Sequence, residues 1–315
     1  MMQKVTIKKT DLTVSALCMG GCPLGGYGWG DIQRTDLINA VKTAVDNGIN
    51  FFDTADIYGL GESERTLADA LGLHNRNVII ATKFGVRIES GKTMYDNSRE
   101  YIFKAVEGSL RRLKREYIDL YQMHYRDEIT PLSDVVETLE CLKRQGKIRY
   151  YGLSNIHEKD DEELKLFGDN NPFVSFQEEY SLACRKNEKE MICFRDEYMM
   201  TPFSWGSLGQ GVLTGKYDEN CKFKTNDRRS RSDYVNFHGE KLIKNLQIVD
   251  TLKQIAMEQN KSISSVAIRW ILDYLKESVV LVGAKNSKQV LQNIEALDWN
   301  LSQNQIERLE QISKE

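Results

Sequence analysis

Three ionisable side chains, Asp53, Lys83 and His124, each stand at the end of a short apolar run, and Tyr58 follows Asp53 by five positions. A carboxylate, an ammonium, an imidazole and a phenol held together can move a proton to or from a reacting oxygen. Taken one at a time, these residues have ordinary explanations, such as a turn, a solvated lysine or a structural histidine. Their convergence is harder to explain structurally, because several desolvated ionisable groups must pair with one another.

Polar, aromatic or small residues end the later apolar runs as well. They are Ser154, Asn155, Gln177, Trp205, Gly283 and Ala284. Side chains alternate between the two faces of a strand, so Asp53 shares a face with Phe51, and Lys83 shares one with Ala81. By the same alternation His124 shares a face with Gln122. The sequence therefore predicts that these end residues gather at one edge of a sheet.

The elements that position these residues are eight short apolar runs separated by amphipathic helical patterns. The runs are 15–20, 49–55, 78–84, 118–125, 148–155, 174–180, 199–205 and 279–284. The helical patterns cover 35–47, 62–72, 98–114, 131–145, 157–167, 185–197, 241–258, 262–276 and 287–297. Eight strands alternating with helices predict an α/β protein with a closed parallel (β/α)₈ TIM barrel, and active sites of such barrels lie at the carboxyl ends of the strands.

Local residues indicate where two of these helices begin and end. Gly48 and Gly146 stand where a glycine just beyond a helix is favoured. Thr130 and Pro131 are expected to be the N-cap and first residue of the helix that Gly146 closes.

Two segments fall outside this alternation. Residues 4–14 alternate and turn at Thr10-Asp11, which predicts an N-terminal hairpin capping the bottom of the barrel. Residues 217–240, which include Arg228, Arg229 and Arg231, are too long for a connector and are expected to form a functional loop over the site. No linker composition interrupts the chain, so we expect residues 1–315 to form a single barrel domain.

Composition and charge exclude several classes of protein. The chain has 315 residues, 41% of them hydrophobic and 28% charged, with a net charge of −3, so neither disorder nor nucleic-acid binding is favoured. No apolar run approaches a membrane span, and the first residues lack a secretory core. The six cysteines fit reduced thiols better than disulfides or a zinc site, so we expect a cytoplasmic protein without a metal, as a monomer or homo-oligomer.

Two nucleotide-binding motifs are not matched. No Gly-x-Gly-x-x-Gly follows an early strand, so a dinucleotide site of the Rossmann type is unsupported. The segment ending in Gly215-Lys216 resembles a phosphate-binding loop, but Gln210 and Tyr217 stand where that motif needs glycine and Ser or Thr.

Several segments, taken in order, resemble the aldo-keto reductase family. They are FFDTADIYG at 51–59, ATKF at 81–84, LYQMHY at 120–125, GKIRYYGLSN at 146–155, GSLGQGVLTGKY at 206–217 and VGAKNSKQVLQNIEAL at 282–297. The resemblance runs from about residue 5 to residue 312. GESER at 61–65 and the long loop before the seventh helix look more like the bacterial and potassium-channel-β-subunit branches of the family.

The resemblance implies a role for each of four residues. Tyr58 would be the general acid that protonates the carbonyl oxygen, and Lys83 would lower the pKa of its phenol. Asp53 would pair with Lys83, and His124 would orient the carbonyl oxygen by a hydrogen bond. No metal is required.

The resemblance also implies a nicotinamide cofactor, because no side chain can supply a hydride. We expect NADPH, with NADH possible, and a small-molecule aldehyde, ketone or sugar-type carbonyl as substrate. Ser154, Asn155 and Gln177 would hold the carboxamide, and Trp205, where the family usually has Tyr, would stack on the ring. The phosphates and adenosine would meet Gly206, Leu208, Gly209, Gly211, Lys216, Gly283, Ala284, Lys285, Gln289, Gln292 and Asn293.

The substrate pocket is expected to include Gly28, Trp29, Tyr125 and the 217–240 loop. Two other functions remain open at this stage. One is a nucleotide-sensing binding module on the same fold, which the intact set of four residues disfavours. The other is a Schiff-base enzyme with Lys83 as nucleophile, which a paired and protonated Lys83 disfavours.

Overall fold

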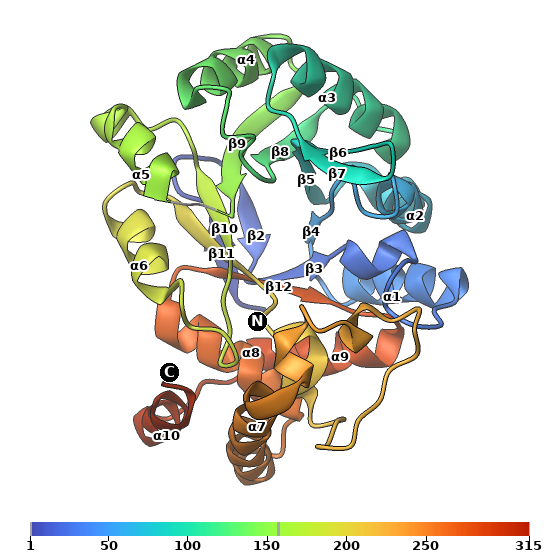
Figure 1. Cartoon of the computed structure of the whole chain (residues 1–315), viewed down its shortest axis with the longest axis vertical. Coiled ribbons are helices and arrows are strands. Elements are labelled where there is room, and N and C mark those ends of the chain that lie inside the picture. Colours follow the sequence, from blue (N-terminus) through green and yellow to red (C-terminus); the bar gives the residue numbers. More distant parts are fainter. Residues whose placement is uncertain (1, 156–157, 315) are drawn as a thin grey trace.

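The computed structural model describes residues 2–155 and 158–314, and its centre is a closed parallel barrel (Figure 1). The eight barrel strands follow one another around the barrel in chain order, and the last, β12, closes it against the first, β3. They are β3 (Leu17–Gly20), β4 (Phe51–Asp53), β5 (Ile79–Phe84), β8 (Ile118–Met123), β9 (Ile148–Ser154), β10 (Ser175–Glu179), β11 (Thr201–Trp205) and β12 (Val279–Gly283). All eight predicted strands are confirmed, and so is the predicted (β/α)₈ barrel.

The alternation of side chains along the strands divides the core into two parts. Phe51, Leu120 and Phe203 belong to a cluster inside the barrel. Phe52 and Tyr121, one position further along their strands, belong to the larger cluster between the barrel and its helices. Because side chains of a strand alternate with a period of two, the residues two positions beyond the interior ones also point into the barrel.

Helices surround the barrel on its outer side (Figure 1). They are α1 (Arg34–Asp46), α2 (Glu62–Leu71), α3 (Arg99–Leu113), α4 (Leu132–Arg144), α5 (Glu158–Lys165), α6 (Glu188–Asp196), α7 (Gly239–Gln259), α8 (Ile263–Leu275), α9 (Ser287–Ile294) and α10 (Gln303–Ser313). Nine were predicted, with ends that differ by a few residues. The predicted start of α5 at residue 157 lies outside the described residues. The sequence pattern did not predict α10, although Ser302 and Gln305 form a capping box at its start.

The predicted start of α4 is wrong by one residue. Pro131 is the N-cap, with φ −57° and ψ 143°, and Leu132 is the first helical residue. Thr130 instead donates its hydroxyl to Asp127, which holds the preceding loop. The predicted helix ends are confirmed, because Gly48 and Gly146 follow the C-caps of α1 and α4 with φ of 85° and 71°.

The N-terminal hairpin closes the barrel at the amino ends of its strands. β1 (Lys4–Thr6) pairs antiparallel with β2 (Thr13–Ser15). Ile7, Leu12 and Val14 of this hairpin pack into the interior cluster, and the Lys8 backbone N–H donates to the hydroxyl of Thr201 at the start of β11. The predicted cap at the bottom of the barrel is confirmed.

A second hairpin lies at the other end, after β5, and was not predicted. It joins β6 (Val86–Glu89) to β7 (Lys92–Tyr95). Every residue of β7 is exposed, so its sequence has no apolar alternation that would indicate a strand.

The long segment, residues 217–238, contains two short 3-10 turns, Arg228–Ser230 and Val235–Phe237. It packs against the loop that follows β3. Trp29 bridges to Asp227, and the Arg228 backbone N–H donates to the Gly28 carbonyl at 3.0 Å. The last two residues of the predicted 217–240 loop belong to α7. Among the helices within the described ranges, none has the length and apolar character that a membrane span requires.

Candidate active site

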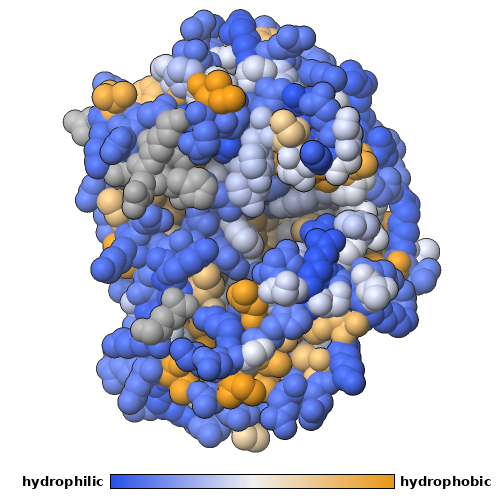
Figure 2. Space-filling view, in the orientation of Figure 1, coloured by the Kyte–Doolittle hydropathy of each residue, from blue (hydrophilic) through white to orange (hydrophobic). Residues whose placement is uncertain are grey.

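A cavity of about 830 Å³ opens at the carboxyl ends of the barrel strands. The face of the molecule around it is largely polar, with a hollow near its centre (Figure 2). The predicted site residues that line the cavity are Asp53, Tyr58, His124, Ser154, Asn155, Gln177, Trp205, Gly206, Leu208, Gly211, Lys216, Gly283, Lys285, Gln289, Gln292 and Asn293. Lys83, Gly209 and Ala284 are buried behind its wall.

A buried ion pair lies at the base of this cavity. Lys83 Nζ donates to Asp53 Oδ1 at 2.5 Å and to the Thr54 carbonyl at 3.0 Å. The second carboxylate oxygen of Asp53 accepts from the side-chain amides of Gln122 and Gln177, each at 3.0 Å. These neighbours hold both charges in fixed positions, as a buried ion pair requires.

Tyr58 lies above this ion pair, in the turn that follows β4. Its ring centroid is 5.3 Å from Lys83 Nζ, and its ring meets that of His124 edge-to-face at 5.7 Å. Gly25 lets this turn approach closely, because a Cβ at that position would lie 2.9 Å from the Tyr58 backbone. The phenol therefore lies over the pair, in a turn that the glycine fixes against the loop after β3.

The expected lowering of the Tyr58 pKa is not found. Burial raises the pKa of the phenol well above its usual value, and the charge of Asp53 acts in the same direction. Tyr58 is therefore a protonated phenol at neutral pH, which is the form that a general acid needs.

His124 is a neutral imidazole in this environment. Burial lowers its pKa well below the usual value, and the nearby charge of Lys83 lowers it further. Its Nδ1 is buried and has no hydrogen-bond partner among the described residues. A neutral ring carries one N–H, so it can donate a hydrogen bond to an oxygen in the cavity.

Fixed polar groups and a glycine-containing loop line one wall of the cavity. The Asn155 side chain donates to the His124 carbonyl at 2.9 Å and to the Ser154 hydroxyl at 3.1 Å, which fixes two polar groups at the end of β9. The indole N–H of Trp205 is buried and has no partner in the described part of the chain. Gly206 and Gly211, in the loop after β11, have φ of 66° and 107°, a backbone conformation that favours glycine.

Cationic side chains lie at the far part of this wall. The Lys285 ammonium donates to the Trp29 carbonyl, and its backbone N–H donates to the Gln289 side chain at 2.9 Å. Burial lowers the pKa of Lys285 to about 8, and the neighbouring charge of Arg229 lowers it further. Lys216 is exposed and lies near Lys288 and Arg229. These cations give this part of the wall the charge that phosphate groups require.

Sequence reasoning missed some functional contacts. Gln177 donates to Asp53, a contact that the expected carboxamide role did not include, and Gln122 was not identified as a site residue. The signal for Gln122 was its alternation with His124 at the end of one strand. Of the expected pocket residues, Trp29 and Tyr125 line the cavity, whereas Gly28 lies beneath the side chain of Arg228. Within the described ranges, no group of three or more His, Cys, Asp or Glu side chains is arranged to hold a metal ion.

Comparisons with known proteins agree on one family. The family model described as "Aldo/keto reductase family" matches residues 16–314. The aldo-keto reductase YhdN of Bacillus subtilis (strain 168) is 31% identical over 304 residues, covering 96% of this chain and 90% of that protein. An NADH-specific methylglyoxal reductase of Escherichia coli (strain K12) is 30% identical and covers 96% and 95%. The structure of the glycerol dehydrogenase AKR11B4 from Gluconobacter oxydans matches with a TM-score of 0.87 and 31% identity, covering 98% of this chain and 94% of that one.

Proposed function

The chain belongs to the aldo/keto reductase family, and we propose that it transfers a hydride from NADPH to an aldehyde, ketone or sugar-type carbonyl, with Tyr58 as the general acid. Members of this family are oxidoreductases that use nicotinamide cofactors and small-molecule carbonyl substrates. One observation carries the proposal. A protonated phenol and a neutral imidazole meet edge-to-face at the cavity, directly above a buried Lys–Asp pair.

Each of the four residues has a separate task in this proposal. Tyr58 gives its proton to the carbonyl oxygen as the carbon is reduced. His124 donates a hydrogen bond to the same oxygen and orients it. The charge of Lys83 stabilises the phenolate that remains, and Asp53 keeps Lys83 protonated and in position. Tyr58 must regain its proton from solvent before the next turnover.

The nicotinamide cofactor supplies the hydride when it is bound. Ser154, Asn155 and Gln177 would hold its carboxamide, and Trp205 would stack on its ring. The glycine-containing loop after β11 would follow the pyrophosphate. We propose NADPH rather than NADH because Lys285, with Gln289 beside it, offers a cation for the 2′-phosphate. Both residues lie in 282–297, the last of the segments that resemble the family.

A Schiff-base mechanism is disfavoured by the surroundings of Lys83. Its side chain is fully buried, does not line the cavity and donates to both Asp53 and the Thr54 carbonyl. A Schiff base needs a neutral amine that a carbonyl carbon can reach.

In our proposal residues 1–315 act as one domain, and the long segment covers the cavity.

A panel of aldehydes, ketones and aldoses, assayed with NADPH and with NADH, tests this function. Oxidation of the nucleotide is followed by its absorbance, and every assay is repeated with Tyr58→Phe to subtract the uncatalysed rate. We expect turnover of at least one carbonyl, faster with NADPH. Saturable nucleotide binding without turnover of any carbonyl would instead favour a binding module.

A further inference from the structure

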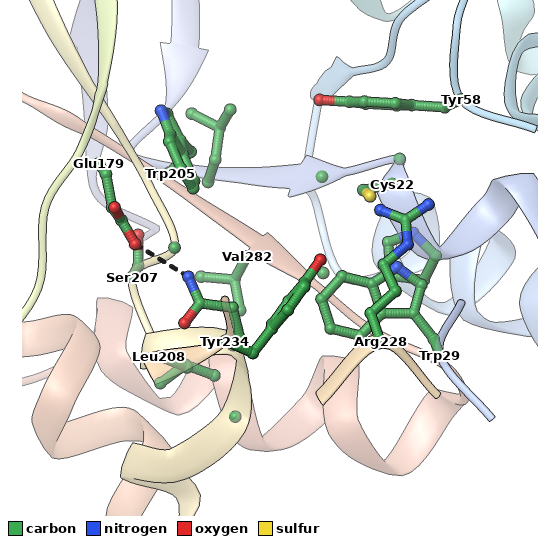
Figure 3. A pocket seen from close by; sticks show the side chains of 18 of the residues that line it. Cys22, Trp29, Tyr58, Glu179, Trp205, Ser207, Leu208, Arg228, Tyr234 and Val282 are labelled. Atoms are coloured by element: carbon green, nitrogen blue, oxygen red, sulfur yellow. Dashed lines mark hydrogen bonds between the residues drawn. The ribbon is translucent and has the colours of Figure 1, made fainter. Parts of the chain in front are cut away.

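Arg228 of the long segment lies in the cavity wall beside the candidate acid. Figure 3 shows its guanidinium next to Cys22, on the Tyr58 side of the pocket and across from Trp205. Arg228 lowers the pKa of Tyr58, although burial dominates the opposite shift of that phenol. The Arg228 guanidinium is therefore close enough to contact a small molecule whose carbonyl group lies against Tyr58.

The side chain of Arg228 is held in place on several sides. Its guanidinium carbon lies 5.3 Å from the ring centre of Tyr27 and 5.9 Å from that of Trp29. Gly28 makes room for it, because a Cβ at that position would lie 2.2 Å from Arg228 Nε. Tyr234 of the same segment also lines the cavity (Figure 3). A cation restrained in this way loses little freedom when it binds a ligand.

The charge of Arg228 is not balanced by a carboxylate. Its neighbour Arg229 forms an ion pair with Asp227 at 2.5 Å. Arg228 forms no ion pair with Asp or Glu within the described ranges, and its guanidinium lies next to Cys22 (Figure 3). Burial raises the pKa of the Cys22 thiol, so Cys22 does not supply a negative charge at neutral pH. A partly desolvated guanidinium without a counter-ion favours binding of an anion.

We propose that Arg228 binds an anionic group of the substrate, so that the preferred substrates are carbonyl compounds that carry a carboxylate or a phosphate. The planar fork of a guanidinium matches both of these groups through paired hydrogen bonds. This inference rests on the proposed function, since it names the substrate class of the same site. The phosphates of the cofactor are the other source of an anion, and the experiment must separate the two.

The test compares carbonyl compounds that differ in one charged group. Benzaldehyde is paired with 4-carboxybenzaldehyde, and glyceraldehyde with glyceraldehyde 3-phosphate. We expect the wild type to prefer at least one charged member by kcat/KM. Arg228→Gln should lower that preference roughly tenfold to a hundredfold, the range of a charge-assisted hydrogen bond. Arg231→Gln, which removes an exposed arginine from the same segment outside the large cavity, should keep the preference.

Three results would overturn the assignment. The first is a wild type that prefers the neutral member of both pairs. The second is an Arg228→Gln variant that keeps the preference. The third is a variant whose NADPH Kd rises while the preference is unchanged, which would assign Arg228 to a cofactor phosphate.

If the wild type reduces no member of either pair, the assignment of Arg228 is judged by binding alone, and if it also reduces no carbonyl of the larger panel, the proposed function fails. Terephthalate is titrated into the protein with NADP⁺ present, and tryptophan fluorescence is recorded. Weaker binding to Arg228→Gln than to Arg231→Gln would support the anion site, and equal binding would overturn it. Equal melting temperatures of the two variants confirm that both are folded.

Discussion

Lys83 Nζ and Asp53 Oδ1 lie 2.5 Å apart in a buried ion pair at the base of the cavity. The pair is positioned by the strand register, since Asp53 stands opposite Ala81 on β5 and Lys83 stands opposite Gln122 on β8. Both charges are therefore fixed before any ligand binds. Removal of one member of the pair should therefore lower the stability of the protein, because it leaves the other charge buried without a counter-ion.

Lys83→Met should lower the free energy of unfolding by about 3–5 kcal/mol, because it leaves the Asp53 carboxylate buried with only amide partners. Denaturant unfolding followed by circular dichroism measures the loss. The matched control is the double variant Lys83→Met/Asp53→Leu, which removes both charges. It should recover much of the stability and none of the activity. A double variant as unstable as the single one would show that packing, and not the charge, accounts for the loss.

Tyr58→Phe should abolish carbonyl reduction and leave the Kd for NADPH nearly unchanged. The substitution deletes one hydroxyl and keeps the ring that packs against His124. Loss of a positioned acid lowers kcat by about 10²–10⁴-fold. Both quantities are measured on the same protein samples, with the best substrate of the panel. A variant that kept more than about a tenth of the wild-type kcat/KM would mean that another group supplies the proton.

The kcat/KM for reduction should change little between about pH 6 and about pH 9, as far as Tyr58 and His124 are concerned. The Tyr58 pKa is raised, so the phenol loses its proton only at higher pH. The His124 pKa is lowered, so the imidazole gains a proton only at lower pH. A pH profile with a neutral substrate measures this. A marked rate loss on going from pH 7 to pH 6 would contradict a neutral His124.

The strand-end positions of the site could be predicted because side-chain alternation is strict in a buried strand. Asp53, Lys83 and His124 end apolar runs. Their polar side chains need polar partners, and these are available at the carboxyl-end rim of the barrel. The alternation also identified the face of Gln122. It could not predict that Gln122 and Gln177 both donate to Asp53, since an amide at a strand end has many possible partners.

The long segment shows where sequence reasoning stops. Arg228 and Arg229 are adjacent and chemically identical, and nothing local indicates which one pairs with Asp227. The structure resolves this, since Arg229 pairs with Asp227 and Arg228 packs over Gly28 instead. The outcome depends on the loop after β3, almost 200 positions away in the chain. Contacts of such long range leave no periodic pattern.

Lys285→Ala should weaken binding of NADPH roughly tenfold to a hundredfold and leave binding of NADH nearly unchanged. A charge-assisted contact to the 2′-phosphate contributes about 1.5–3 kcal/mol, and NADH lacks that group. Nucleotide fluorescence titration gives both Kd values. Lys253→Ala, an exposed lysine on α7, serves as the control for a general loss of positive charge. Equal losses for the two nucleotides would show that Lys285 does not recognise the phosphate.

Asp56 is a second acid in the turn that carries Tyr58, and it forms no ion pair within the described part of the chain. Its Oδ1 is buried without a hydrogen-bond partner among the described residues. Glu64 lies nearby and forms its ion pair with Arg112. Burial raises the pKa of Asp56 to about 7, and the charge of Glu64 adds to the shift. In the unfolded chain the same carboxyl group has a pKa of about 4.

The folded protein therefore binds one more proton than the unfolded chain between about pH 4 and about pH 7, and the stability from Asp56 falls as pH rises through this window. Asp56→Asn removes the titration. Between about pH 5 and about pH 8 the wild type should lose on the order of 2 kcal/mol of unfolding free energy relative to the variant. Urea unfolding at both pH values measures the shift, and contributions from other groups cancel in the difference. An unchanged difference would mean that Asp56 is ionised throughout, with a partner formed in solution.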